Sequence, residues 1–274
     1  MHYDLAAASV TLLYVSLAIK MNLIEAIRRK KLLVSAWIVR CVVRPLLQQT
    51  GSGYLSSVGL ENIDLQIAHL LPCKRNGFFI EAGANDGISQ SNTYYLEKVL
   101  GWRGILVEPI CEKAKLCEKN RRQSITINGA LVRTGGPSHV TVEYANLMSM
   151  VRDGVIPDDV VDRHIETGRA VQCISSPRTS EVAKGFALQQ ILDQHAVDHV
   201  DFLSLDVEGY ELQSLLGIDF SRTRIDAIFV ETRPNNEKAI DELLSKVGYT
   251  WERIWVSRSC SNYLYLFREK TQSP

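Results

Sequence analysis

Short apolar runs alternate with segments of helical periodicity over most of this chain. The apolar runs predict buried strands and the segments between them predict helices, whose ends follow from cap and stop residues. The strands are 77–82, 104–109, 125–132, 201–206, 226–231, 249–256 and 262–267, and the helices are 62–71, 92–100, 111–122, 187–194 and 210–216. This alternation is typical of an α/β fold in which helices cover both faces of a parallel sheet.

One internal region departs from this alternation. From Arg133 to Thr179 the pattern predicts a strand at 139–144 and is otherwise irregular. Because long idle loops are uncommon in compact domains, this region is a candidate substrate lid. His139 and His164 could act as bases there, although each is more typical of a surface histidine.

Residues 1–50 differ in charge from the rest, with seven basic and two acidic side chains and a net charge of 7 − 2 = +5. Their apolar run at 5–19 is shorter than the roughly 20 residues that span a bilayer and has no basic start, so no cleaved signal is expected. We predict a helical extension that either contacts an anionic membrane surface through its basic cluster at 28–31 or caps the folded domain. Residues 51–76 are predicted to form a linker and a lead-in helix.

Composition narrows the class of protein. With 274 residues, 46% of them hydrophobic, and a formal net charge of zero, the chain can bury one sizeable α/β core. Neutral charge argues against a nucleic-acid binder, which needs a basic surface to displace counterions. The six cysteines form no C-x-x-C pair and no metal-ligand spacing, so we expect reduced thiols, a cytoplasmic location and no metal. No pattern indicates the oligomeric state.

The strongest chemical signal is a turn after the first strand, F-F-I-E-A-G-A-N-D-G at 78–87. Gly83 and Gly87 let the backbone turn tightly and approach a ligand, and polar groups after a parallel strand face the crevice where cofactors bind. A plain surface turn is the alternative. The next strand, however, ends in Glu108, 25 residues after Gly83, where a carboxylate can accept both ribose hydroxyls.

Asn85 and Asp86 indicate which nucleotide cofactor binds. A dinucleotide fingerprint needs glycine at the position of Asn85, because a side chain there crowds a pyrophosphate. Asp86 adds a negative charge that repels phosphate and attracts an ammonium or sulfonium group. S-adenosylmethionine therefore fits this turn better than NAD or ATP.

Four motifs together resemble the FkbM family of S-adenosylmethionine-dependent methyltransferases. They are E-A-G-A-N-D-G at 81–87, S-N-T at 91–93, V-E-P at 107–109 and D-F-L-S-L-D-V-E-G-Y-E-L at 201–212. The resemblance spans 77–267 and implies a Rossmann-like class I methyltransferase fold over about 77–270, with a mostly parallel seven-stranded sheet completed by an antiparallel hairpin. It also implies, as the usual reaction, methyl transfer to a hydroxyl oxygen.

The predicted cofactor contacts lie near the ends of the first three strands. They are Glu81, Gly83, Asn85, Asp86, Gly87, Asn92, Glu108 and Ala130, the last because the third strand should end beside the adenine.

The resemblance places Asp206 and Glu208 in the active site, where a carboxylate can hold an acceptor hydroxyl and take its proton. Which of the two acts as base stays open, and Glu208 could instead cap the helix that follows. Glu231 and Arg233 could line the acceptor pocket or pair with each other.

The acceptor is predicted to be a glycan or another small or lipid-linked hydroxyl compound. Two rival functions stay open. A nicotinamide-dependent oxidoreductase would use the same strand-turn-helix unit, and a membrane-associated binding protein could retain the fold without catalysis.

Overall fold

A computed structural model describes residues 57–71, 74–256 and 260–268 of this chain. The predicted N-terminal extension, 1–50, and its predicted contact with a membrane lie outside these residues. Within the described part, no helix combines the length and the apolar character that crossing a membrane requires.

A seven-stranded sheet forms the centre of the domain, in the order β10-β11-β9-β8-β1-β2-β3. The strands are β1 Phe78–Ala82, β2 Arg103–Glu108, β3 Ile125–Asn128, β8 His199–Leu205, β9 Arg224–Thr232, β10 Tyr249–Val256 and β11 Ser261–Phe267. Strand β11 runs antiparallel between β9 and β10, whereas the remaining neighbours are parallel. The predicted mostly parallel sheet with a final hairpin is confirmed.

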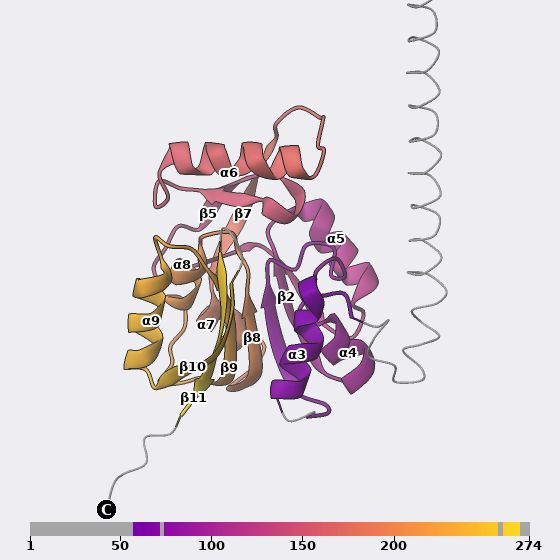
Figure 1. Ribbon diagram of the computed structural model, residues 1–274, viewed down its shortest axis with the longest axis vertical. Helices are drawn as coiled ribbons and strands as arrows, with labels where there is room; N and C mark the ends of the chain where they lie inside the picture. The colour runs from indigo at the N-terminus through magenta and orange to yellow at the C-terminus, as the bar shows by residue number, and fades with distance from the viewer. Residues whose placement is uncertain (1–56, 72–73, 257–259, 269–274) are drawn as a thin grey trace, which may run out of the picture. The chain divides into compact units, whose positions relative to one another are not determined.

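Helices cover both faces of this sheet (Figure 1). On one face lie η2 Leu60–Asn62, α3 Ile63–Leu70, α4 Tyr94–Leu100 and α5 Cys111–Asn120, and on the other lie α7 Leu188–Gln194, α8 Glu211–Leu215 and α9 Glu237–Lys246. Each group buries its apolar side against the sheet in a separate core cluster. Ile67 of α3 is fully buried in one of them, so core packing already begins before residue 77.

A second, four-stranded sheet packs at one end of the domain, in the order β4-β7-β5-β6. Its strands are β4 Ala130–Val132, β5 His139–Glu143, β6 Met150–Arg152 and β7 Ser180–Ala187, with η3 Asn146–Met148 between β5 and β6. Helix α6, Asp158–Val171, lies across this sheet and shares a buried core with it (Figure 1).

Two expectations are corrected by this sheet. The single strand predicted over 125–132 is divided at Gly129, because Ile125–Asn128 pairs with β2 while Ala130–Val132 pairs with β7. The region 133–179 contains the predicted strand, as β5, but is not otherwise irregular, since it also contributes β6 and α6. The pairings of β4 and β5 with β7 join segments that are distant in sequence, so local periodicity could not reveal those pairings.

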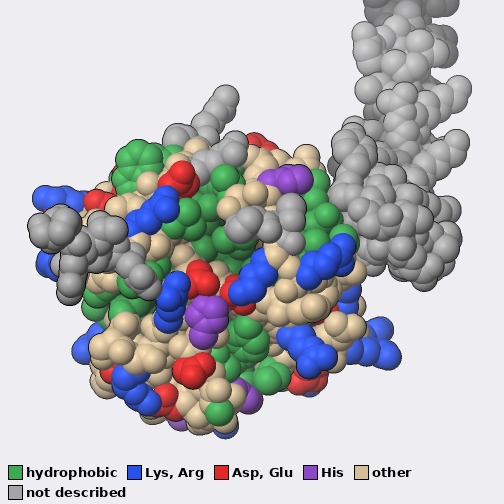
Figure 2. All heavy atoms as spheres, turned by 90° about the horizontal axis from the view of Figure 1, so that it is seen from below, with side chains coloured by type: hydrophobic (Ala, Val, Ile, Leu, Met, Phe, Trp, Pro, Cys, Tyr) green, Lys and Arg blue, Asp and Glu red, His purple; other side chains and the backbone are tan. Residues whose placement is uncertain are grey.

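The surface at the amino ends of the central strands carries charges of both signs. Figure 2, viewed from below Figure 1, shows acidic and basic side chains side by side and no continuous basic area on the described part of this face. A mixed surface of this kind lacks the phosphate-binding stripe of a nucleic-acid binder.

Gly83 directly follows β1 and packs against the backbone of Asp206, which follows β8. Substitution of Gly83 therefore tests how closely the two loops must approach. Its φ is 81°, and an added Cβ would overlap the carbonyl oxygen of Asp206. Gly135 has a similar φ of 69° but open space around its Cβ position. We expect Gly135→Ala to lower the free energy of unfolding by about 1 kcal/mol and Gly83→Ala by roughly 3 kcal/mol or more.

Denaturant titration of both variants checks this difference. Equal losses of stability in the two variants would mean that backbone strain alone matters at Gly83.

Candidate functional site

Two adjoining clefts open at the carboxyl ends of the central strands. The first has a volume of about 570 Å³ and is lined by the ends of β1 and β2 and by the small sheet. The second has a volume of about 1000 Å³ and is lined by the loop after β1 and by the end of β9. The residues that line both are Ala82, Gly83, Leu147, Asp206 and Glu208. The clefts therefore meet at the two predicted catalytic carboxylates.

Glu108 lies in the first cleft at the tip of β2. Its carboxylate accepts hydrogen bonds from the backbone N–H groups of Asn85, at 2.7 Å, and Ile110, at 2.9 Å. Burial raises the pKa of Glu108 to about 7, although these two hydrogen bonds act in the opposite direction. Each oxygen keeps a lone pair that can accept a further hydrogen bond, as a ribose diol requires.

Asn85 lines the same cleft and has an unsatisfied side-chain acceptor. Its φ is 48°, and the residue is 7% exposed. The buried Oδ1 atom has no hydrogen-bond partner within the described residues. Because an orphaned buried carbonyl is costly, this atom suits a ligand that carries a donor. Gly129 and Ala130, the latter a predicted cofactor contact, also line this cleft.

Asp86 and Gly87 do not line either cleft. The Asp86 carboxylate accepts hydrogen bonds from the backbone N–H groups of Ile88, at 2.9 Å, and Ser89, at 2.6 Å. It therefore shapes the turn, and the structure does not support our argument that its charge faces the cofactor.

The negative charge of the two clefts comes from residues other than Asp86. The charged residues that line them are all acidic: Glu81, Glu108, Asp206, Glu208 and Glu231. No lysine, arginine or histidine of the described chain lines either cleft. An acidic cavity of this kind favours a cationic ligand.

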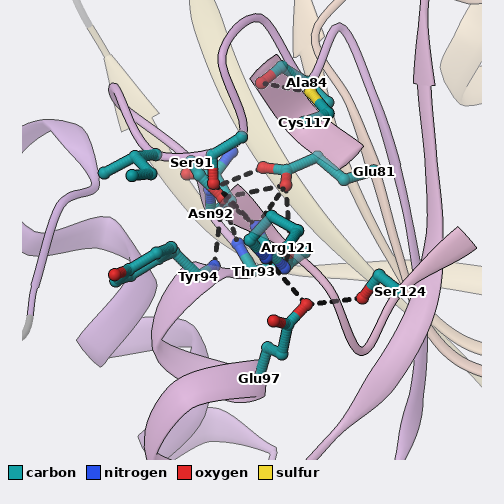
Figure 3. Close-up of polar contacts among 12 residues, drawn as sticks. Glu81, Ala84, Ser91, Asn92, Thr93, Tyr94, Glu97, Cys117, Arg121 and Ser124 are labelled. Atoms are coloured by element: carbon teal, nitrogen blue, oxygen red, sulfur yellow. Dashed lines mark hydrogen bonds and ion pairs between the residues drawn. The ribbon is translucent and has the colours of Figure 1, made fainter. Parts of the chain in front are cut away.

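Glu81 and Asn92 meet in the second cleft. Oε1 of Glu81 accepts a hydrogen bond from the backbone N–H of Asn92 at 2.8 Å, and the Asn92 amide donates to Ser204 Oγ at 3.1 Å. Oε2 of Glu81 accepts from the hydroxyls of Ser91 and Thr93 (Figure 3). Both predicted cofactor residues are therefore fixed parts of the cleft wall.

Asp206 directly follows β8 and faces both clefts. Within the described residues its carboxylate has no hydrogen-bond or ion-pair partner, since its recorded bonds involve only the backbone. Burial, and then the nearby carboxylates of Glu231 and Glu208, raise its pKa well above the ordinary value for aspartate. It is thus an unusually basic and unengaged carboxylate.

Glu208, in contrast, is contacted by an arginine and a histidine. Its backbone has a φ of 56°, and its carboxylate forms an ion pair with Arg233. His164 of α6 places Nε2 at 3.1 Å from the same oxygen, without the alignment of a hydrogen bond, and Nδ1 at 3.3 Å from Arg233. Glu231 lines the second cleft and lies 3.5 Å from Arg233.

The two candidate histidines differ in position. His164 is buried beside Glu208, whereas His139 is exposed at the start of β5. Sequence reasoning treated both as surface residues. The only signal for His164 was the amphipathic pattern of 158–171, which places it on the buried side of a helix with Val161 and Ile165.

Glu211 is a structural residue that the sequence reasoning missed. It is fully buried, and its carboxylate accepts hydrogen bonds from Gly209 N–H at 2.8 Å, Val207 N–H at 3.2 Å and the Asn236 amide at 2.9 Å. The helix begins at Glu211. Glu211, and not Glu208 as the capping alternative supposed, therefore holds the start of this helix and the loop that carries the two predicted catalytic residues.

One group of potential metal ligands is present in the described residues, and it lies away from the clefts. His199, Asp201 and Asp226 are at the amino ends of β8 and β9. Asp201 pairs with Lys74, and Asp226 pairs with Arg224 at 2.8 Å.

A Rossmann-like sheet with an acidic cofactor cleft at its carboxyl edge defines a nucleotide-cofactor transferase of the class I methyltransferase type. The family model "Methyltransferase FkbM domain" matches residues 81–250, which is more than half of the chain. The chain therefore belongs to the FkbM methyltransferase family, and its cofactor is S-adenosylmethionine. A search of curated proteins found no match.

Solved structures with a similar fold include three methyltransferase-related proteins. Aeropyrum pernix fibrillarin with bound S-adenosylmethionine is 13% identical, with a TM-score of 0.43 and coverage of 74% of each chain. Precorrin-6y C5,15-methyltransferase from Geobacter metallireducens is 10% identical, with a TM-score of 0.43 and coverage of 75% of this chain and 87% of that one. A putative RNA methyltransferase from Pyrococcus horikoshii is 10% identical, with a TM-score of 0.41 and coverage of 77% and 83%.

Burial of Glu211 predicts a pH dependence of stability. Its pKa is raised from 4.5 to about 7, mainly by burial, so the folded state binds the proton more tightly than the unfolded state. Its contribution is fully present below pH 4.5 and is lost as the pH rises through 7. We expect this loss to reach about 3 kcal/mol at most.

Glu211→Gln mimics the protonated form and should remove this part of the pH dependence. Unfolding titrations from pH 5 to 8 on both proteins measure it. Parallel curves for variant and parent would show that Glu211 does not titrate in this range.

Proposed function

We propose that this protein transfers the methyl group of S-adenosylmethionine to a hydroxyl oxygen of an acceptor bound in the second cleft, with Asp206 as the general base. The observation that supports this most directly is the position of Asp206. Its unengaged carboxylate lies where the cofactor cleft and the second cleft meet.

The residues of the first cleft fit the adenosine half of the cofactor. Glu108 would accept hydrogen bonds from the ribose hydroxyls, and Asn85 Oδ1 would accept a donor such as the adenine amine. Gly129 and Ala130 leave room for the base. When bound, the cofactor supplies a methyl group on a sulfonium. The thioether that leaves needs no protonation.

Asp206 suits the removal of the hydroxyl proton. An alcohol becomes a better nucleophile when a positioned carboxylate accepts its proton during methyl transfer. A carboxylate whose pKa is raised by burial and by neighbouring acids accepts that proton more readily than an ordinary aspartate. Nothing in the described chain competes for this side chain.

Glu208 has a supporting role in this proposal. Its ion pair with Arg233 and its contact with His164 hold it in one orientation and leave it less free than Asp206 to take a proton from an acceptor. It can still accept a hydrogen bond from a second acceptor hydroxyl, because a carboxylate has several lone pairs. The joint assignment of Asp206 and Glu208 is thereby divided into a base and an orienting residue.

The lining of the second cleft favours an acceptor with several hydroxyl groups, such as a sugar. Apart from the wall at 89–92, polar uncharged side chains are contributed by three separate parts of the chain: Gln172, Ser204 and Asn262. Amide and hydroxyl groups of this kind both donate and accept, as sugar hydroxyls require. Leu60, Ile63, Met148, Val171 and Phe229 provide apolar contacts for ring faces or for a lipid tail.

Substitution of the two carboxylates tests these roles. We expect Asp206→Asn to reduce methyl transfer by roughly 100- to 10,000-fold, because the base is lost, and Glu208→Gln to reduce it less. Calorimetry should show that both variants retain S-adenosylmethionine binding better than methyl transfer. Transfer of a labelled methyl group to a panel of glycans and hydroxylated small molecules measures the rate.

Asp226→Asn is the matched control, since this aspartate lies at the opposite end of the sheet. Activity of Asp206→Asn equal to that of the control would remove the proposed base. Binding of S-adenosylmethionine without transfer to any hydroxyl acceptor would favour a non-catalytic binding protein.

The raised pKa of Asp206 predicts the pH dependence of the reaction. Because only the deprotonated carboxylate can accept a proton, kcat should fall as the pH is lowered through this pKa, which lies above the ordinary value for aspartate. A pH profile of kcat measures the position of this acidic limb. A limb at the usual aspartate pKa, or one that persists in Asp206→Asn, would assign it to another group.

A further inference from the structure

We infer that Arg121, which lines neither cleft, is a positioning residue that sets the wall of the second cleft for the amino-acid end of S-adenosylmethionine. The inference rests on the proposed placement of the cofactor, with its adenosine half in the first cleft. A ligand that extends from there past Gly83 enters the second cleft, where Ser89, Gln90, Ser91 and Asn92 form one wall.

The guanidinium of Arg121 is fully buried and is bonded to this wall from behind. The residue follows α5 as its C-terminal cap. Its NH1 atom donates to Gly87 O and to Ser91 Oγ, each at 3.1 Å, and NH2 donates to Thr93 Oγ1 at 2.9 Å. One side chain thus fixes both ends of the segment that contributes to the cleft.

Glu81 holds the same segment from the other side (Figure 3). It accepts hydrogen bonds from Ser91 Oγ at 2.8 Å, Thr93 Oγ1 at 2.6 Å and Asn92 N–H at 2.8 Å. The two hydroxyls therefore lie between a carboxylate and a guanidinium, and each can point its proton only toward the carboxylate. This arrangement leaves the segment a single conformation.

The charges in this network are unequally shared. Arg121 Nε donates to Glu97 Oε2 at 2.8 Å, whereas its NH1 atom is 3.5 Å from Glu81. Although burial acts to raise the pKa of Glu97, Arg121, Lys98 and Ser124 hold it below its ordinary value, so Glu97 is ionised. Arg121 is thus paired mainly with Glu97, and the Glu81 carboxylate lines the cleft, where its oxygens suit the cofactor ammonium.

Lysine cannot reproduce this network, which makes Arg121→Lys the informative variant. An ammonium keeps the charge but has no planar fork to reach Glu97, Ser91 and Thr93 together. Thr93→Val is a second variant of nearly equal shape. Thr93 lines neither cleft, yet its hydroxyl links Glu81 to Arg121.

The affinities of two ligands distinguish a positioning role of Arg121 from a general loss of structure. S-adenosylhomocysteine carries both the adenosine and the amino-acid end, whereas 5′-methylthioadenosine carries the adenosine and the sulfur but no amino-acid end. Calorimetry on the full chain should show that Arg121→Lys and Thr93→Val weaken S-adenosylhomocysteine binding by about tenfold or more, because small displacements of a site are costly. Binding of 5′-methylthioadenosine should be unchanged.

Two control variants calibrate this comparison. Glu108→Gln changes the proposed ribose site and should weaken both ligands. Tyr249→Phe removes a buried hydrogen bond to Ile225 O, 2.7 Å long and outside both clefts, so it should lower Tm and leave both affinities unchanged.

Equal weakening of both ligands in Arg121→Lys and Thr93→Val, or no weakening of S-adenosylhomocysteine binding, would overturn the inference. These binding measurements require no acceptor. Failure of the parent protein to methylate any hydroxyl would therefore contradict the proposed function while leaving this comparison intact.

Discussion

The close approach of β1 and β8 is the constraint on which both clefts depend. The backbone at Gly83 passes so near the carbonyl oxygen of Asp206 that no side chain fits between them. The turn after β1 and the loop after β8 are thereby brought together at the carboxyl edge of the sheet. A cofactor bound along the first loop consequently lies beside the carboxylates carried by the second.

Charge in this site is arranged in two layers. Acidic side chains line the clefts, while the arginines that partner two of them, Arg121 behind Glu81 and Arg233 beside Glu208, line neither. The cavity therefore presents acidic side chains to a sulfonium cofactor, while arginines behind the cavity wall offset part of their charge. Within the described residues Asp206 has no such partner, and our proposal of Asp206 as base and Glu208 as an orienting carboxylate rests on this difference.

The second sheet and its helix α6 contribute directly to the site region. Val142, Leu147 and Val151 contribute to the wall of the first cleft, and His164 of α6 contacts Glu208. The part of the fold that lines the first cleft therefore also contacts the loop after β8. This gives a physical route by which movement of α6 would alter the orientation of Glu208.

The sequence by itself determined the central sheet and the tight turn after its first strand, whereas the roles of individual residues stay predictions. Apolar runs ending in Gly83, Glu108 and Asp206 specify parallel strands with polar tips, because periodicity and turn chemistry are local properties. The division of the third strand at Gly129 and the small sheet escaped this reasoning, since both depend on pairing with β7 far along the chain.

Only the tertiary structure decided what each polar side chain faces. Asp86 belongs to the predicted cofactor motif but closes its own turn, whereas Arg121 and His164 reach the site region from helices whose sequences carry no motif. Spacing along a strand or turn fixes where a residue is placed. The choice between Asp206 and Glu208 depends on partners brought by other elements, because burial and neighbouring charge set the basicity of a carboxylate.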